Sequence, residues 1–457
     1  RSPVGGALQF ERLESEVTDL TAVTGAYPLD IDADGQPDLA VLRRGENVLL
    51  RGLDDCAFER ANEAWAFDGG DDWTTAFSAT WEDGQDWPTL AFGAYVDHVD
   101  EQGIAHCGTN YPLWPAQSGD AFAAPAPLDP GRCALSMLFS DWDRSGRRDL
   151  RVSNDRHYYY EDGEEQLWQM TPGVAPRLYT REDGWQQVNI YGMGIASQDL
   201  TQDGLPEVYL TTIGSNRLES LAENASTPTF EDIAHPRGVT VTTPSIGKPI
   251  YPSTCWHPEF DDVNNDSRMD LFVSKGNVDA IPDNALEDPN ELLMGLPDGR
   301  FRRATSRAGI LDTMRTRGAA LVDLNSDGLL DIVEVHRVEN VSLRRNVGSG
   351  DADQPRAMGH WLAVKLEQDG PNVAAIGAWI EVDDGRRSTV REITVGGGHA
   401  GGELGPVHFG LGGQDEARVR VAWPDGSQGP WLTVPADRTI TIDRQAAETG
   451  AHESSGS

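Results

Sequence analysis

The sequence predicts an all-β protein, a β-propeller followed by a small β-sandwich or barrel module. Two observations predict it. An acidic string recurs along most of the chain, and each copy runs into a short segment of apolar and β-branched residues. The chain has 457 residues, of which 38% are hydrophobic, so it is long enough to bury a sizeable core and to form at least two domains.

The acidic strings recur at intervals of about 60 residues, which is the length of a repeated supersecondary unit. They read DIDADGQPD, DWDRSGRRD, DLTQDGLPE, DVNNDSRMD and DLNSDGLLD and begin at Asp30, Asp141, Asp199, Asp262 and Asp323. The gap between the first two is about twice the interval, and a degenerate copy, WEDGQDWPTLAFG, begins at Trp81 between them. The chain therefore holds six copies of one unit.

The segments after the strings alternate like strands: DLAVL, DLRVS, EVYLT, DLFVS and DIVEV. The i, i+3, i+4, i+7 spacing of an amphipathic helix is missing from them. Units of this length that cannot bury their own faces stack radially as four-stranded blades of a propeller, which hides most strand edges. We favour seven blades, with the N-terminal segment and residues around 340–357 sharing a closing blade, and six blades are the alternative.

Each acidic string spaces its oxygen donors to surround one hard cation. Side chains stand at positions 1, 3, 5 and 9 of the loop, the backbone carbonyl is at position 7, and a glycine at position 6 usually lets the chain bend. The predicted donors are Asp30, Asp32, Asp34, Gln36 and Asp38; Asp141, Asp143, Ser145, Arg147 and Asp149; Asp199, Thr201, Asp203, Leu205 and Glu207; Asp262, Asn264, Asp266, Arg268 and Asp270; and Asp323, Asn325, Asp327, Leu329 and Asp331.

We expect about five Ca²⁺ ions in these loops. An EF-hand is excluded, because position 12 is Val41 in the first loop and Val273 in the fourth, where an EF-hand has glutamate. Single D-x-D-x-D-G strings also occur as simple turns, but five copies in phase with the repeat favour a metal. Mg²⁺ fits less well, because it demands a tight octahedron and retains its waters. The loop at Asp141 is the least regular, with Ser145 in place of an acid and three arginines nearby.

Composition limits the partners. The net charge of −37 and pI of about 4.4 argue against nucleic acid, which is bound by clustered lysine and arginine. The excess acid suits divalent cations or a saline exterior, although part of it is an ordinary solvated surface. The longest apolar runs fall short of the ~20 residues that cross a bilayer. We expect an exported protein, periplasmic or extracellular, with its signal peptide removed.

The four cysteines are widely spaced and lack a C-x-x-C metal or haem signature. Cys107 and Cys133 bracket a long stretch rich in proline, alanine and glycine, which a crosslink would constrain. We expect this pair to be bonded, with free buried thiols as the alternative. In an oxidising compartment Cys56 and Cys255 could form a second bridge.

The loops resemble the FG-GAP or VCBS repeats of integrin-type propellers. The segments NVAAIGAWIEV, REITVGGGHAGGE, VHFGLGG and VRVAWPDGS resemble the ASPIC/UnbV domain in that order. The combination is similar to bacterial relatives of the cartilage acidic protein family. The resemblance implies a calcium-binding propeller over residues 1–357 and an ASPIC/UnbV β-domain over 358–445. We expect a disordered tail over 446–457, where apolar residues are few.

The sequence leaves two function classes open. It contains no nucleophile elbow, zinc-protease or phosphate-loop motif, and the glycine-rich VGGGHAGGE stretch lies in a β-module. An exported binding, adhesion or scaffold module with a glycan or protein ligand is the first class. The second is a lyase or hydrolase acting on a carbohydrate or secondary metabolite in the axial channel. If the strand after each loop is innermost, the polar residues that face this channel are Arg43, Asn154, Thr212, Lys275 and His336, with His157 and His257 nearby.

Overall fold

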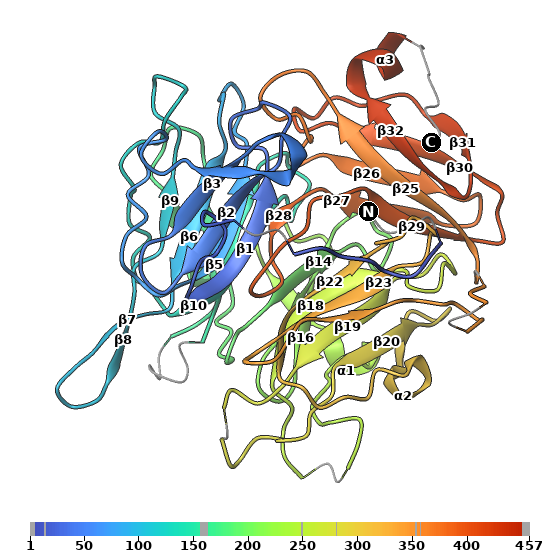
Figure 1. Ribbon diagram of the computed structural model, residues 1–457, viewed down its shortest axis with the longest axis horizontal. Coiled ribbons are helices and arrows are strands. Elements are labelled where there is room, and N and C mark those ends of the chain that lie inside the picture. The colour runs from blue at the N-terminus through green and yellow to red at the C-terminus, as the bar shows by residue number, and fades with distance from the viewer. Residues whose placement is uncertain are drawn as a thin grey trace.

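The computed structural model describes residues 5–12, 15–155, 163–247, 250–279, 281–351, 354–356 and 358–449. Nearly all regular structure in these ranges is β-strand, as predicted, and it forms a ring of blade-like sheets with a C-terminal module beside it (Figure 1). Among the described residues no helix is long and apolar enough to cross a membrane.

Six antiparallel sheets follow one another along the chain and form the blades. They are β1 (Val23–Leu29), β2 (Asp38–Arg43), β3 (Val48–Gly52) and β4 (Phe58–Arg60); β5 (Thr74–Thr80), β6 (Thr89–Ala94) and β9 (Tyr111–Leu113); β10 (Ala134–Ser140), β11 (Asp149–Asn154), β12 (Gln166–Gln169) and β13 (Arg177–Leu178); β14 (Ile195–Gln198), β15 (Glu207–Leu210), β16 (Arg217–Leu221) and β17 (Phe230–Asp232); β18 (Cys255–Asp261), β19 (Asp270–Lys275), β20 (Glu291–Gly295) and β21 (Phe301–Arg303); and β22 (Thr316–Val322), β23 (Asp331–His336) and β24 (Ser342–Arg344). In the described ranges the structure therefore has six blades and not the favoured seven, because β24, within the segment expected to close a seventh blade, belongs to the sixth.

Each acidic loop joins the first strand of its blade to the second, and its position 9 is the first residue of the second strand. The first strands are innermost: β5 packs against β1 and β10, and β18 packs against β14 and β22. The assumption that the strand after the loop is innermost was therefore wrong. The apolar pattern of that strand reflects burial between its two sheet neighbours, and such burial does not reveal radial position.

The C-terminal module is a sandwich of two sheets, which decides between the two architectures expected. One sheet has the order β29 (Val407–Gly412), β25 (His360–Glu367), β32 (Arg438–Asp443), and the other has β27 (Ser388–Glu392), β26 (Trp379–Asp383), β30 (Glu416–Ala422), β31 (Leu432–Pro435). Leu362, Ile380, Phe409 and Val419 fill the space between the sheets. A short helix, α3 (Arg444–Thr449), follows, and Ala447 packs onto this core, so the module extends beyond residue 445. Residues 450–457 of the expected tail lie outside the described residues.

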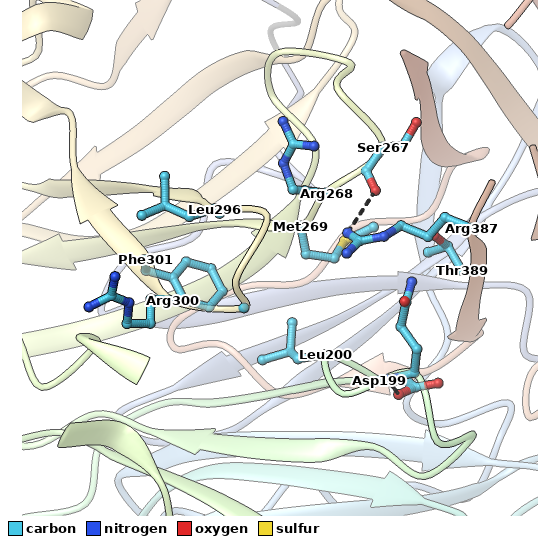
Figure 2. A pocket seen from close by; sticks show the side chains of 13 residues that line it. Asp199, Leu200, Ser267, Arg268, Met269, Leu296, Arg300, Phe301, Arg387 and Thr389 are labelled. Atoms are coloured by element: carbon cyan, nitrogen blue, oxygen red, sulfur yellow. Dashed lines mark hydrogen bonds between the residues drawn. The ribbon is translucent and has the colours of Figure 1, made fainter. Parts of the chain in front are cut away.

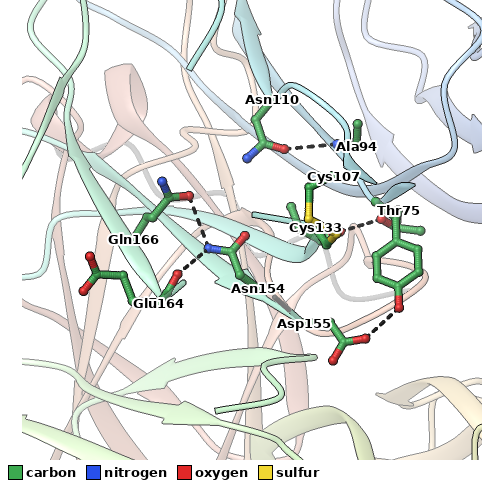
Figure 3. Close-up of a disulfide and its surroundings, with 11 residues drawn as sticks. Thr75, Ala94, Cys107, Asn110, Cys133, Asn154, Asp155, Glu164 and Gln166 are labelled. Atoms are coloured by element: carbon green, nitrogen blue, oxygen red, sulfur yellow. Dashed lines mark hydrogen bonds between the residues drawn. A yellow bond between two sulfur atoms is a disulfide. The ribbon is translucent and has the colours of Figure 1, made fainter. Parts of the chain in front are cut away.

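One disulfide joins Cys107 to Cys133, as predicted (Figure 3). Cys107 ends β8 (Ala105–Cys107), which pairs with β7 (Val96–Val99) in a hairpin that projects from the second blade, and Cys133 directly precedes β10. The disulfide therefore links the β7–β8 hairpin to the first strand of the third blade. Cys56 is exposed and Cys255 is buried, and both are free thiols, so the second bridge does not form.

Candidate metal-binding loops and the domain junction

The five acidic loops share one backbone conformation. The residue at position 4 has a left-handed φ in every loop: 60° at Ala33, 56° at Arg144, 61° at Gln202, 56° at Asn265 and 57° at Ser326. Position 6 is left-handed too. It is serine, Ser267, in the loop beginning at Asp262 and glycine in the other four loops. The bend at position 6 was predicted. The bend at position 4 was not, because no glycine marks it in the sequence.

The same hydrogen bonds hold the acids in each loop. The position 1 carboxylate accepts the N–H of position 6, at 3.0 Å from Gly35 to Asp30 and 2.7 Å from Gly328 to Asp323. The position 9 acid accepts a donor from the third-strand side of the blade and, in four of the loops, the N–H of position 2, as Asp38 does from Gly52 (2.7 Å) and Ile31 (2.6 Å). In the second loop Asp149 accepts the Trp142 indole N–H instead, at 3.0 Å. Position 5 accepts the N–H of position 7 in Asp34, Asp203, Asp266 and Asp327. The backbone thus aims several carboxylates into one turn.

The first loop brings three carboxylates close together. Ligand oxygens of Asp30, Asp32 and Asp38 all lie within 4.8 Å of one another. One buried oxygen of Asp30 and one of Asp32 have no hydrogen-bond partner among the described residues. Burial raises the pKa of Asp38 to about 7, and the charges of Asp32 and Asp30 add to the effect. Orphaned oxygens and mutually repelling acids fit a hard cation, which would satisfy both.

The other loops show the same signs to different degrees. Within the described part of the chain, a buried side-chain oxygen of Asn325 in the last loop has no hydrogen-bond partner, and neither has one of Asp141 in the second. Burial raises the pKa of Asp262 to about 8, and that of Asp199 and of Asp331 to about 6. In the third loop Glu207 already accepts the hydroxyls of Thr201 and Ser220 at 3.0 Å, so fewer lone pairs remain there for an ion.

Arginine side chains neutralise part of the acidic charge. Arg51 lies 2.7 Å from Asp32 and 3.0 Å from Asp34, at the edge of the first site. In the second loop Arg147 forms two bonds to Asp149, at 2.9 and 3.1 Å, and this acid also accepts the Tyr179 hydroxyl. Because the predicted position 9 ligand is already paired with a guanidinium, the second loop fits a metal least well.

Three of the acidic loops also contact the C-terminal module. Gln202 of the third loop donates to the Ser388 carbonyl at 3.1 Å, and Arg387 donates to the carbonyl of Ser267 in the fourth loop at 3.2 Å. Figure 2 shows this junction, where Arg387 and Thr389 of the module lie beside Asp199, Leu200, Ser267 and Arg268 of the propeller loops. In the second loop, the Arg144 guanidinium stacks on Trp379 of the module at 4.0 Å. The loops are therefore a docking platform for the module.

The glycine-rich segment Val395–Gly402 leaves the module and occupies the axis of the propeller. Within it, β28 (Val395–Gly396) pairs with both β5 and β10, Gly398 forms a bridge with Ile195 of β14, and Gly401 forms one with Ala26 of β1. At the fifth blade, the N–H of His399 donates to the His257 imidazole at 3.0 Å. We call this segment the axial plug. Glycines suit it because side chains would collide with the surrounding strands; a Cβ at Gly396 would lie 2.7 Å from the Phe77 carbonyl.

The residues predicted to line the channel lie elsewhere, with one exception. Arg43, Asn154, Lys275 and His336 end second strands, Thr212 lies just beyond one, and all are engaged locally. Lys275 is fully buried 3.0 Å from Asp288, and His336 lies between the hydroxyls of Thr316 and Ser342. His257 does reach the axis, from β18, where it meets the plug. His157 lies outside the described residues.

These strand ends have a recurrent structural role that the sequence analysis missed. The N–H groups of Arg43, Ala94, Thr212 and Lys275 donate to the side chains of Asn47, Asn110, Asn216 and Asn290, at 2.7–3.1 Å. Each asparagine directly precedes the next strand of its blade. The repeated asparagine at this register is visible in the sequence and could have revealed the role. The varied residues before it therefore lie at strand ends whose N–H groups these asparagines bind.

Comparisons with known proteins agree with this architecture. The sequence matches the FG-GAP-like repeat family over residues 262–334 and the family described as ASPIC and UnbV over residues 368–449. Over 244 residues, 52% of this chain, it is 26% identical to mouse and 25% identical to human cartilage acidic protein 1. The match covers 34% and 33% of those proteins, so the chain aligns with about a third of their length. The chain thus carries an FG-GAP-like repeat and an ASPIC/UnbV domain and is distantly similar to cartilage acidic protein 1.

Solved structures match only weakly. An Agrocybe aegerita lectin that recognises non-reducing terminal N-acetylglucosamine has a TM-score of 0.37 at 14% identity, covering 68% of this chain and 74% of the lectin. The rhamnogalacturonan lyase YesX has a TM-score of 0.37 at 13% identity, covering 92% of this chain and 73% of the lyase. A family 43 glycoside hydrolase from Bacillus licheniformis has a TM-score of 0.34 at 11% identity, covering 95% and 93%. At these scores the likenesses carry no functional argument.

Proposed function

We propose that the chain is a calcium-stabilised, exported binding module in which Ca²⁺ ions in the blade loops order the platform that holds the C-terminal sandwich. The convergence of Asp30, Asp32 and Asp38 around unpaired oxygens carries the proposal. When bound, Ca²⁺ would offset the mutual repulsion of these acids, of which Asp38 is buried and Asp32 has Arg51 beside it. The loops beginning at Asp199, Asp262 and Asp323 repeat the backbone geometry of the first, and we include them as sites.

Export and a binding role have separate support. A disulfide forms and persists in oxidising compartments, which is consistent with a periplasmic or extracellular location. The axial plug occupies the space in which an axial-channel lyase or hydrolase would hold its substrate. We therefore favour binding of a glycan or protein ligand over channel catalysis.

Calcium removal tests the metal. We expect chelation to lower the melting temperature of the full chain, because an ion that binds only the folded state at 100 times its dissociation constant adds about 2.7 kcal/mol per site. Elemental analysis should show that Asp32→Asn loses one ion and Asp298→Asn loses none, since Asp298 is an exposed partner of Arg300 outside the loops. Equal melting curves for chelated and calcium-loaded protein, with metal removal verified, would contradict the proposal.

A further inference from the structure

A cleft of about 530 Å³ lies between the C-terminal module and two propeller loops. Its lining comprises Arg144 from the second acidic loop, Asp203, Gly204 and Leu205 from the third, and Trp379, Glu381, Val390, Arg420, Ala422 and Gln428 from the module. The volume falls in the range of small-ligand sites, which often form between domains. The cleft is separate from the first acidic loop and from the axial plug, both of which rest on other residues.

Arg144 gives the cleft an uncommitted cation. Its guanidinium carbon lies 4.0 Å from the centroid of the Trp379 ring, and within the described part of the chain the guanidinium makes no hydrogen bond or ion pair. Stacking on an aromatic face fixes the plane of the guanidinium and leaves its fork of N–H donors free at the edge. A pre-oriented, unpaired guanidinium matches the two oxygens of a carboxylate.

The rest of the lining is suited to hydroxyl groups. Arg420 is held by two bonds to one oxygen of Glu381, whose other oxygen accepts the Ser388 hydroxyl at 2.9 Å. Each carboxylate oxygen can accept a further hydrogen bond, and the Gln428 amide adds another acceptor. Trp379 is 5% exposed, and its indole N–H has no hydrogen-bond partner among the described residues. A ligand that offers both acidic oxygens and donors would complement this set.

We propose that this cleft binds an acidic saccharide, with the sugar carboxylate on Arg144 and the hydroxyl groups on Glu381 and Gln428. The assignment rests on the proposed binding function and names its ligand class. A neutral sugar would leave the N–H donors of Arg144 without a carboxylate to receive two charge-assisted hydrogen bonds. A polyanion without hydroxyl donors would face the acids of the lining with no compensating hydrogen bonds.

Calorimetric titration of the full chain with trigalacturonate tests the proposal, with maltotriose as the neutral saccharide and an acidic peptide of equal charge as the alternative ligand class. We expect trigalacturonate to bind and maltotriose and the peptide not to bind. Arg144→Gln should weaken that binding at least about tenfold, because a charge-assisted pair is lost. Arg60→Gln, which removes an exposed arginine on the outer strand of the first blade, should leave it unchanged.

The possible results separate this proposal from the preceding one. Absence of trigalacturonate binding, equal binding of maltotriose, or an equal loss in both variants would overturn the saccharide site. Binding of the peptide with the same dependence on Arg144 would overturn the ligand class. The titration is repeated in the presence of chelator, and the melting temperature is measured under the same conditions. If chelation leaves the melting temperature unchanged and trigalacturonate still binds, the calcium proposal fails and the saccharide site stands.

Discussion

Substitution of Gly398 by alanine tests whether the axial plug fastens the two domains together. Gly398 has a φ of +55°, where an L-residue costs about 1–2 kcal/mol. The new Cβ would also lie 2.3 Å from the His257 ring, which therefore has to move. That movement breaks the 3.0 Å hydrogen bond from the His399 N–H, worth about 1 kcal/mol, and leaves buried groups unpaired at about 1–2 kcal/mol more. We expect the substitution to lower the free energy of unfolding by about 3–5 kcal/mol.

Gly426→Ala is the matched control, because Gly426 also has a positive φ, +82°, but a Cβ there meets no atom within 4 Å. It should cost only the backbone strain, about 1–2 kcal/mol. For a cooperative chain of 457 residues, 1 kcal/mol corresponds to about 1 °C in melting temperature. Because the backbone strain is common to both variants, calorimetry should separate them by about 2–3 °C, and limited proteolysis should cleave Gly398→Ala faster between the domains. Equal melting temperatures and equal cleavage would refute the view that the plug fastens the domains.

Two further predictions concern pH and the disulfide. Burial lowers the pKa of His399 to about 3, so its contribution to stability is fully present above the unfolded pKa of about 6.5 and is lost as the pH falls. Between pH 7 and pH 4.5, urea unfolding should show that the parent loses about 2–3 kcal/mol more than His399→Gln; parallel losses would count against this assignment. Replacing Cys107 and Cys133 together by alanine should cost about 3–4 kcal/mol, because the bond closes a loop of 26 residues, whereas Cys56→Ala should cost almost nothing. A melting temperature unchanged by the double replacement would contradict that estimate.

The acidic loops were predictable because their determinants are local. Aspartates spaced two residues apart, with a flexible position 6, dictate a turn in which the backbone N–H groups hold the carboxylates, as Gly35 does for Asp30. A repeated local turn also predicts a repeated blade. The sequence did not predict which distant side chains would pair with the acids of a loop and so compete with a metal ion for them. Arg51 comes from a neighbouring strand, and only the folded blade brings its guanidinium to Asp32.

The sequence alone determined the strand class, the repeat, the acidic loops, the disulfide and the separate C-terminal β-module, because periodicity, spacing and turn chemistry act over short stretches of chain. The tertiary structure decided which strand faces the axis, which the sequence analysis assigned to the wrong strand. It also placed Val395–Gly402 against strands from the first to the fifth blade and stacked Arg144 on Trp379. These contacts join segments up to hundreds of residues apart, and they depend on how whole sheets pack.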